Sequence, residues 1–200
     1  MSKGRGILLV SERSDWVEYK EIQKKIAEAV TKIWSEDIPY DYETFSLLKE
    51  DALKCAIYHH LRSRLEAVLC KNNLRIFPEY YIEELKYRAD IAIVRINPAN
   101  IKPKLKDMVT DVIAIFELKY DCSKNKSTTD CILKDVDKIR IYVKEMNKDC
   151  HYYFACINEV EMDSLKWFSE QDVNSWAKNK VTELDAGYVD GYMEFEVNSY

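Results

Sequence analysis

Glycine is scarce in this chain of 200 residues, and its distribution excludes several enzyme classes. None of the four glycines lies between Gly6 and Gly187. The phosphate-binding loop of NTPases, the G-x-G-x-x-G turn of dinucleotide-binding domains and the G-x-S-x-G nucleophile elbow all need glycines at fixed positions. The sequence therefore excludes these three sites and predicts no nucleotide cofactor.

Long apolar runs and metal-type cysteine patterns are also missing. No run approaches the roughly 20 apolar residues that span a bilayer, and Glu12 and Arg13 end the short apolar patch near the start too early for a secretory signal. The six cysteines form no C-x-x-C pair and no zinc-site spacing with the three histidines. We therefore expect a cytoplasmic protein with reduced cysteines and no membrane partner.

The bulk composition indicates one soluble globular domain. A content of 47% hydrophobic and 32% charged residues is ordinary, and 200 residues can bury a real core. The net charge of −5 argues weakly against a general polyanion binder, because local patches matter more than the total.

Two helices are expected in the first third of the chain, over residues 14–33 and 44–69, separated by a break at Ile38-Pro39-Tyr40-Asp41. Glu50 falls in the middle of the apolar stripe of the second helix, so a carboxylate points toward the core. The stripes are Ile22, Ile26, Ala29, Val30 and Ile33 in the first helix, and Leu53, Ile57, Leu61, Leu65 and Val68 in the second.

The rest of the chain reads as strands with interspersed helices. Strands are predicted over 74–82 (with Pro78 at an edge or bend), 88–96, 111–120, 151–157 and 192–197, and helices over 131–147 and 162–180. This order predicts an α/β fold in which a mixed sheet lies between helical layers. We expect a single domain with a helical extension over 1–43, a core over 44–157 and a final helix and strand over 158–200.

The strand over 111–120 organises this arrangement. Val112 to Phe116 are continuously apolar, as in a strand covered on both faces. Glu117 and Lys119 follow it on one face, because residues two apart on a strand point the same way. Asp90 stands just before the apolar part of the neighbouring strand. Two carboxylates and an amine are therefore expected at adjacent strand ends.

This set of residues suits metal-assisted hydrolysis of a phosphodiester. Two neighbouring carboxylates repel each other unless a cation lies between them, and oxygen ligands favour Mg²⁺ or Mn²⁺. The cation would stabilise charge on a phosphate, and its field would lower the pKa of Lys119, which could then deprotonate or orient a water.

Glu50 on a helix, R-A-D ending at Asp90 and F-E-L-K containing Glu117 and Lys119 resemble the PD-(D/E)xK nuclease superfamily over residues 44–157. The resemblance implies a three-layer α/β/α restriction-endonuclease-like core and a nuclease that cleaves DNA in restriction, repair or mobile-element settings. It also implies that Asp90, Glu117 and the main-chain carbonyl of Leu118 bind the metal. Lys119 would act on the water, Glu50 would help to hold metal or water, and Asp135 or Lys138 would contribute from outside. Ala89 replaces the proline of the family's name.

Simpler interpretations of the same residues stay open. Glu117 and Lys119 could form a surface ion pair, Asp90 could be a turn residue at a strand entry, and Glu50 could complement the helix dipole. Glu79 is a rival for the accessory carboxylate. At the level of function, the alternatives are a catalytically inactive nuclease-like fold acting as a binding or regulatory subunit, and an assembly protein whose first helix forms a homodimer.

Overall fold

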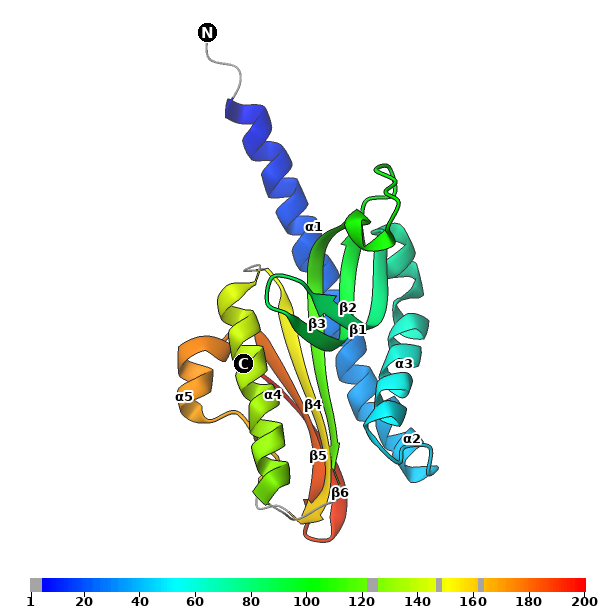
Figure 1. Ribbon diagram of the computed structural model, residues 1–200, viewed down its shortest axis with the longest axis vertical. Coiled ribbons are helices and arrows are strands. Elements are labelled where there is room, and N and C mark those ends of the chain that lie inside the picture. The colour runs from blue at the N-terminus through cyan, green and yellow to red at the C-terminus, as the bar shows by residue number, and fades with distance from the viewer. Residues whose placement is uncertain (1–4, 122–125, 147–148, 162–163) are drawn as a thin grey trace.

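The computed structural model describes residues 5–121, 126–146, 149–161 and 164–200, with side chains throughout except at 5–16 and 126–128. A six-stranded mixed sheet lies between two helical layers (Figure 1). The strands are β1 (Leu74–Ile82), β2 (Tyr87–Ile96), β3 (Val109–Asp121), β4 (His151–Glu161), β5 (Val181–Val189) and β6 (Tyr192–Ser199). The helices are α1 (Arg5–Lys32), α2 (Ile38–Glu43), α3 (Glu50–Lys71), α4 (Lys126–Glu145) and α5 (Glu170–Asp172), with π-helical turns at Ile33–Asp37 and Val173–Ala177 and a 3₁₀ turn at Leu105–Met108.

The strands lie in the sheet in chain order, from β1 at one edge to β6 at the other. The first three are antiparallel, β4 and β5 run parallel to β3, and β6 returns antiparallel. Parallel neighbours need a crossover, and α4 provides it between β3 and β4. The predicted α/β architecture with a mixed sheet and helices on both faces is confirmed.

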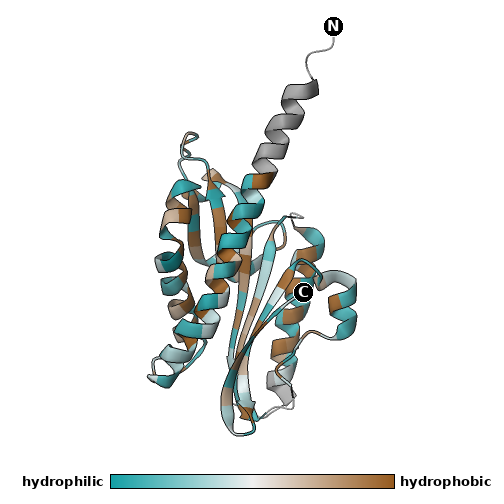
Figure 2. Cartoon of the chain, turned by 180° about the vertical axis from the view of Figure 1, so that it is seen from behind, coloured by the Kyte–Doolittle hydropathy of each residue, from teal (hydrophilic) through white to brown (hydrophobic). Residues whose placement is uncertain are grey.

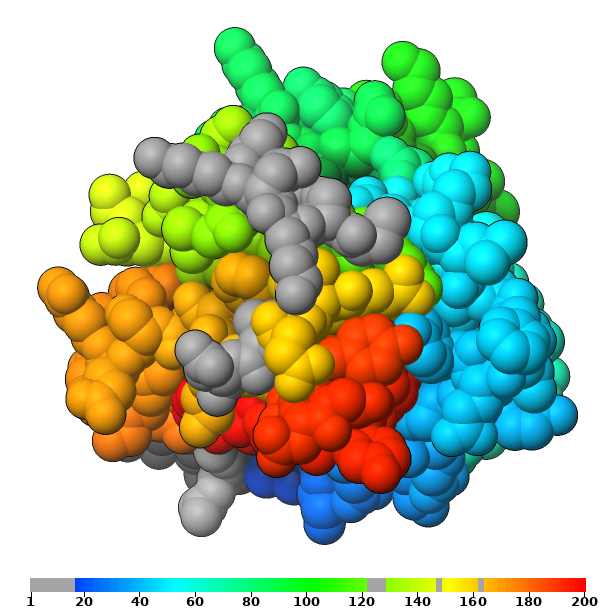
Figure 3. All heavy atoms as spheres, turned by 90° about the horizontal axis from the view of Figure 1, so that it is seen from below, coloured from blue at the N-terminus to red at the C-terminus, as the bar shows by residue number. Residues whose placement is uncertain are grey.

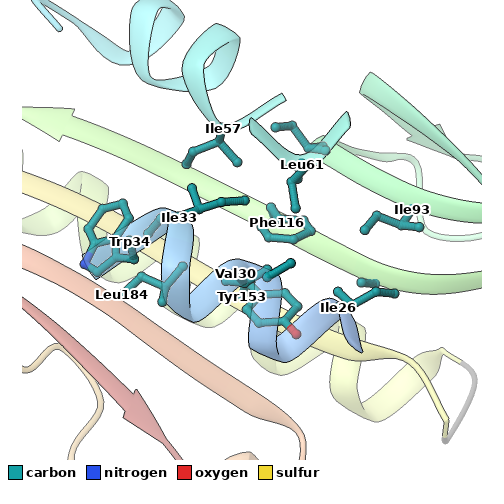
Figure 4. Packing of buried hydrophobic residues seen from close by; sticks show 14 of the residues in the cluster. Ile26, Val30, Ile33, Trp34, Ile57, Leu61, Ile93, Phe116, Tyr153 and Leu184 are labelled. Atoms are coloured by element: carbon teal, nitrogen blue, oxygen red, sulfur yellow. The ribbon is translucent and has the colours of Figure 1, made fainter. Parts of the chain in front are cut away.

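One face of the sheet is covered by α1 and α3. Leu61 of α3 is fully buried near Phe116 of β3, and Trp34 of the π-helical turn after α1 is fully buried near Leu184 of β5 (Figure 4). The helix faces predicted to be apolar are the buried ones, apart from Val68, which is only partly buried. The colouring by hydropathy shows the apolar residues of these helices turned toward the sheet (Figure 2).

The second face is covered by α4 and the segment around α5. Ile132, Val136 and Ile139 of α4 pack on Tyr152 and Phe154 of β4. No helix in the described part of the chain is long and apolar enough to cross a membrane.

The sheet forks between β2 and β3. β2 stays paired with β1 as far as Tyr87, but its ladder with β3 begins at Ile91 and Phe116. The end of the β1–β2 hairpin turns toward α4, where Tyr87 packs edge-on against Tyr142 (Figure 1). The fork leaves backbone groups of both strands without a ladder partner at that point, and these must find other partners.

Several predicted boundaries are wrong. α1 begins at Arg5 rather than at residue 14, and α4 begins at Lys126 rather than at residue 131. Pro39 does not end the helical segment, because a π-helical turn precedes it and Pro39 takes an early position of α2, where its missing N–H is not needed. The second helix begins at Glu50 rather than at residue 44. Helix over 162–180 is limited to residues 170–177 within the described part, and the unpredicted β5 follows.

Truncation of Leu61 is expected to destabilise the fold strongly. Leu61 is fully buried beneath α3, so Leu61→Ala removes apolar contacts and leaves a cavity. We expect the free energy of unfolding to fall by about 2–5 kcal/mol in urea denaturation. Leu48→Ala, at a position 78% exposed, is the matched control and should change it by less than about 0.5 kcal/mol. Equal effects of the two substitutions would contradict the assigned core.

Candidate functional site

The fork in the sheet places Asp90 beside Glu117. Asp90 immediately precedes Ile91 and Glu117 immediately follows Phe116, the pair that ends the antiparallel β2–β3 ladder, so Asp90 and Glu117 lie opposite each other. Asp90 Oδ2 accepts a hydrogen bond of 2.8 Å from the backbone N–H of Leu118. Asp90 therefore lies within β2, not in a turn before it, and satisfies a backbone donor that the fork sets free.

Glu117 is a buried carboxylate, only 1% exposed. Tyr142 donates to its Oε1 at 2.9 Å and Lys138 donates to its Oε2 at 2.7 Å, both from α4. The pKa of Glu117 is raised to about 8, because burial outweighs the opposing effect of the Lys138 ammonium and the Asp90 charge adds to the rise. Glu117 is thus not the exposed member of a surface ion pair, and a nearby positive charge would favour its ionised form.

Lys119 joins the two helical layers. Its Nζ lies 3.1 Å from Glu50 Oε2 of α3 and 3.0 Å from Asp135 Oδ2 of α4. Burial alone would lower the pKa of Lys119, but these two carboxylates outweigh burial and raise it. In this arrangement Lys119 is a charged ammonium at neutral pH, and the lowering expected from the field of a bound cation stays a prediction.

Lys54 of α3 contacts the other side of Asp90. Its Nζ lies 2.8 Å from Asp90 Oδ1 and also contacts Glu79 of β1. Glu79 lies opposite Asp90, because the strand residues on either side of the two are register pairs. Arg88 Nη1 lies 3.4 Å from Glu79 Oε2. Glu79, Asp90 and Glu117 therefore occupy neighbouring positions on three adjacent strands.

The start of α3 is held in place by the segment before it. The Tyr120 hydroxyl lies 3.0 Å from the carbonyl oxygen of Leu47 and 2.9 Å from Glu159 Oε1, and its one hydrogen is shared between them. Tyr42 donates to the same Glu159 oxygen at 2.9 Å. Seen from below, the α2–α3 segment (cyan) lies beside the ends of β4 and β5 (Figure 3). These contacts position Glu50 at the first turn of α3, facing Lys119.

Two carboxylates, Asp90 and Glu117, are the oxygen donors that could hold a divalent cation at the fork. Asp90 and Glu117 are oxygen donors on adjacent strands, their charges repel, and each already binds a lysine ammonium, which shows that the site favours positive charge. Mg²⁺ needs only one or two protein carboxylates, because it keeps several waters. Among the described residues, no three His, Cys, Asp or Glu side chains are grouped so that they could hold a metal together.

The residues predicted for the site lie near one another, but they form two separate sets of contacts. Asp90, Glu117 and Leu118 lie at the fork, whereas Glu50 pairs with Lys119 rather than with the other carboxylates. Asp135 and Lys138, expected as outer residues, do contact Lys119 and Glu117.

Two contributors could not be identified from the strand motif. Tyr142 follows Lys138 by four residues on α4, and Lys54 follows Glu50 by four residues on α3. A spacing of four residues places each pair on one helix face, which is the signal in the sequence that could have identified Lys54 and Tyr142.

A second pair of buried acids lies on the unpredicted β5. Glu183 accepts from the backbone N–H of Trp167 and Phe168 and from the Tyr200 hydroxyl. Burial and the Glu183 charge raise the pKa of Asp185 well above its usual range. The protonated form of Asp185 is therefore favoured beside Glu183.

Known proteins provide no further guide to this chain. No family model matches it, and no curated protein and no solved structure matches it. The resemblance to PD-(D/E)xK nucleases depends on the residues and geometry described above.

Titration of Glu117 is expected to weaken the fold as pH rises. Its pKa in the folded protein is about 8 against an ordinary value of 4.5, so unfolding releases a proton between these pH values and stability falls as pH increases. From pH 4.5 to 8.5 the wild type should lose on the order of 4 kcal/mol relative to Glu117→Gln, which cannot titrate. Urea denaturation in EDTA measures the difference, and the exposed Glu66→Gln serves as control. Parallel pH curves for wild type and Glu117→Gln would contradict the assignment.

Proposed function

We propose that the chain is a divalent-metal-dependent nuclease of the PD-(D/E)xK type that hydrolyses phosphodiester bonds in DNA. The observation that supports it most is the position of Asp90 opposite Glu117 at the fork, with Lys119 two residues further on the same strand. Three chain segments supply the residues that the motif requires, and they meet at one place in the sheet.

Each residue has a distinct role in this proposal. Asp90 and Glu117 would hold Mg²⁺ or Mn²⁺, which supplies Lewis-acid stabilisation of the phosphate and activation of water. Lys138 and Tyr142 orient Glu117 through its two oxygens. Lys119, a charged ammonium between Glu50 and Asp135, orients the water or stabilises phosphate charge as a donor, and its raised pKa argues against a role as the base.

The charge balance of the site is consistent with a need for metal. Its acids are Glu50, Glu79, Asp90, Glu117 and Asp135, and its bases are Lys54, Arg88, Lys119 and Lys138. The acids exceed the bases by one once Glu117 is ionised. A bound divalent cation would favour that ionised form and leave the site with a net positive charge that attracts a phosphate.

A second candidate function is a nuclease-like fold that acts only by binding. It is favoured by the fact that Asp90 and Glu117 each have a lysine partner and that Lys119 has two carboxylate partners. Such a closed set of ion pairs can hold α3 and α4 on the sheet without any metal.

Cleavage assays distinguish the two functions. The purified chain should cut plasmid, linear or branched DNA with Mg²⁺ or Mn²⁺ and should not cut in EDTA. We expect Asp90→Asn and Glu117→Gln to abolish cleavage, and Lys119→Met to lower kcat by about 10²–10³-fold, because a positioned donor is lost. Lys178→Met, at an exposed position after α5, should retain full activity.

Activity that survives Asp90→Asn would show that the cleavage comes from another site or from a contaminant. Absence of cleavage on all three DNA forms, with DNA binding retained, would favour the binding-only function.

A further inference from the structure

One ammonium group lies between two carboxylates at the fork. Lys54 Nζ is 2.8 Å from Asp90 Oδ1 and also contacts Glu79 Oε1. The Lys54 side chain is 14% exposed, the Asp90 side chain 18% and the Glu79 side chain 48%. Lys54 is therefore held between Asp90, which is a proposed metal ligand, and Glu79, which is not.

We propose that Lys54 is an internal counter-ion that a divalent cation displaces from Asp90, and that Glu79 keeps the displaced ammonium. Lys54 would then determine how tightly the site binds metal. This inference rests on the proposed function, because it uses Asp90 as a metal ligand.

The two oxygens of Asp90 differ in what holds them. Oδ2 accepts from the Leu118 backbone N–H, which belongs to the sheet and stays in place. Oδ1 is held by an ammonium on a flexible four-carbon stem. A divalent cation and an ammonium repel each other at one carboxylate, so metal can bind Asp90 well only if Lys54 leaves.

Glu79 is a second partner that the Lys54 ammonium can keep without a large movement of its side chain. Glu79 and Asp90 lie opposite each other on β1 and β2, and Lys54 already contacts both. A partly buried ammonium without a partner would be costly, and Glu79 removes that cost. Lys138 differs, because it also donates to the Arg88 carbonyl at 2.7 Å and so has a partner in the β2 backbone as well as in Glu117.

Calorimetric titration of the full chain with Mn²⁺ tests the exchange. Lys54→Met should bind Mn²⁺ about tenfold more tightly than wild type, since a charge-assisted hydrogen bond no longer competes. Lys54→Gln, which keeps a donor without the charge and serves if Lys54→Met is poorly folded, should also bind more tightly. Lys49→Met is the control, because Lys49 pairs with Asp51 on the outer side of the same helix start, and it should bind as wild type does.

Glu79→Gln extends the test as a double-mutant cycle. If Glu79 acts by holding the displaced ammonium, Glu79→Gln weakens Mn²⁺ binding in the wild type but has no effect when Lys54 is already Met. Equal weakening in both backgrounds would mean that Glu79 binds the metal itself, which overturns the exchange.

The remaining outcomes separate the inference from the function. If Asp90→Asn abolishes Mn²⁺ binding and Lys54→Met leaves it unchanged or weaker, the inference is wrong and the metal site stands. If neither the wild type nor the Lys54 variants bind Mn²⁺ in a way that depends on Asp90, both the inference and the metal site of the proposed function are wrong.

Discussion

The separation of β2 from β3 is the constraint on which the rest of the site depends. Where the ladder ends, backbone groups lose their strand partners, and a buried polar group without a partner costs about 1–3 kcal/mol. Asp90 accepts from the freed Leu118 N–H, and Lys138 donates to the Arg88 carbonyl. Charged side chains thus replace the missing ladder bonds. Asp90 and Glu117 are then neighbours, and positive charge is needed to offset the two carboxylates.

The two helical layers meet that need in the same way. α3 presents Glu50 and Lys54 one turn apart, and these pair with Lys119 and Asp90. α4 presents Asp135 and Lys138, which pair with Lys119 and Glu117. Each of these charged strand residues therefore pairs with an oppositely charged residue of α3 or α4. The same ion pairs that surround the proposed metal site also hold both helices against the sheet.

Five of the six strands could be predicted from the sequence, because β2, β3 and β4 contain continuous buried apolar runs and β1 and β6 alternate more buried with more exposed residues. β5 could not be, since Glu183 and Asp185 interrupt it and Asp is unfavourable in strands. Glu183 is buried because backbone and hydroxyl donors bind it, and burial of Asp185 favours its protonated form. The strand residues of the site follow from the spacing of Glu117 and Lys119 and the position of Asp90. Lys54 and Tyr142 do not, because their roles arise only when helices distant along the chain pack on the fork.

The strand that contributes Glu79 is also an edge of the sheet. Pro78 has no N–H to offer, and Glu79 has a left-handed backbone with φ of 54°. An incoming strand from another molecule would meet a missing donor, a local twist and a charge along this stretch of β1. The irregularity that sets Glu79 beside Lys54 therefore also protects the open side of the sheet against edge-to-edge aggregation.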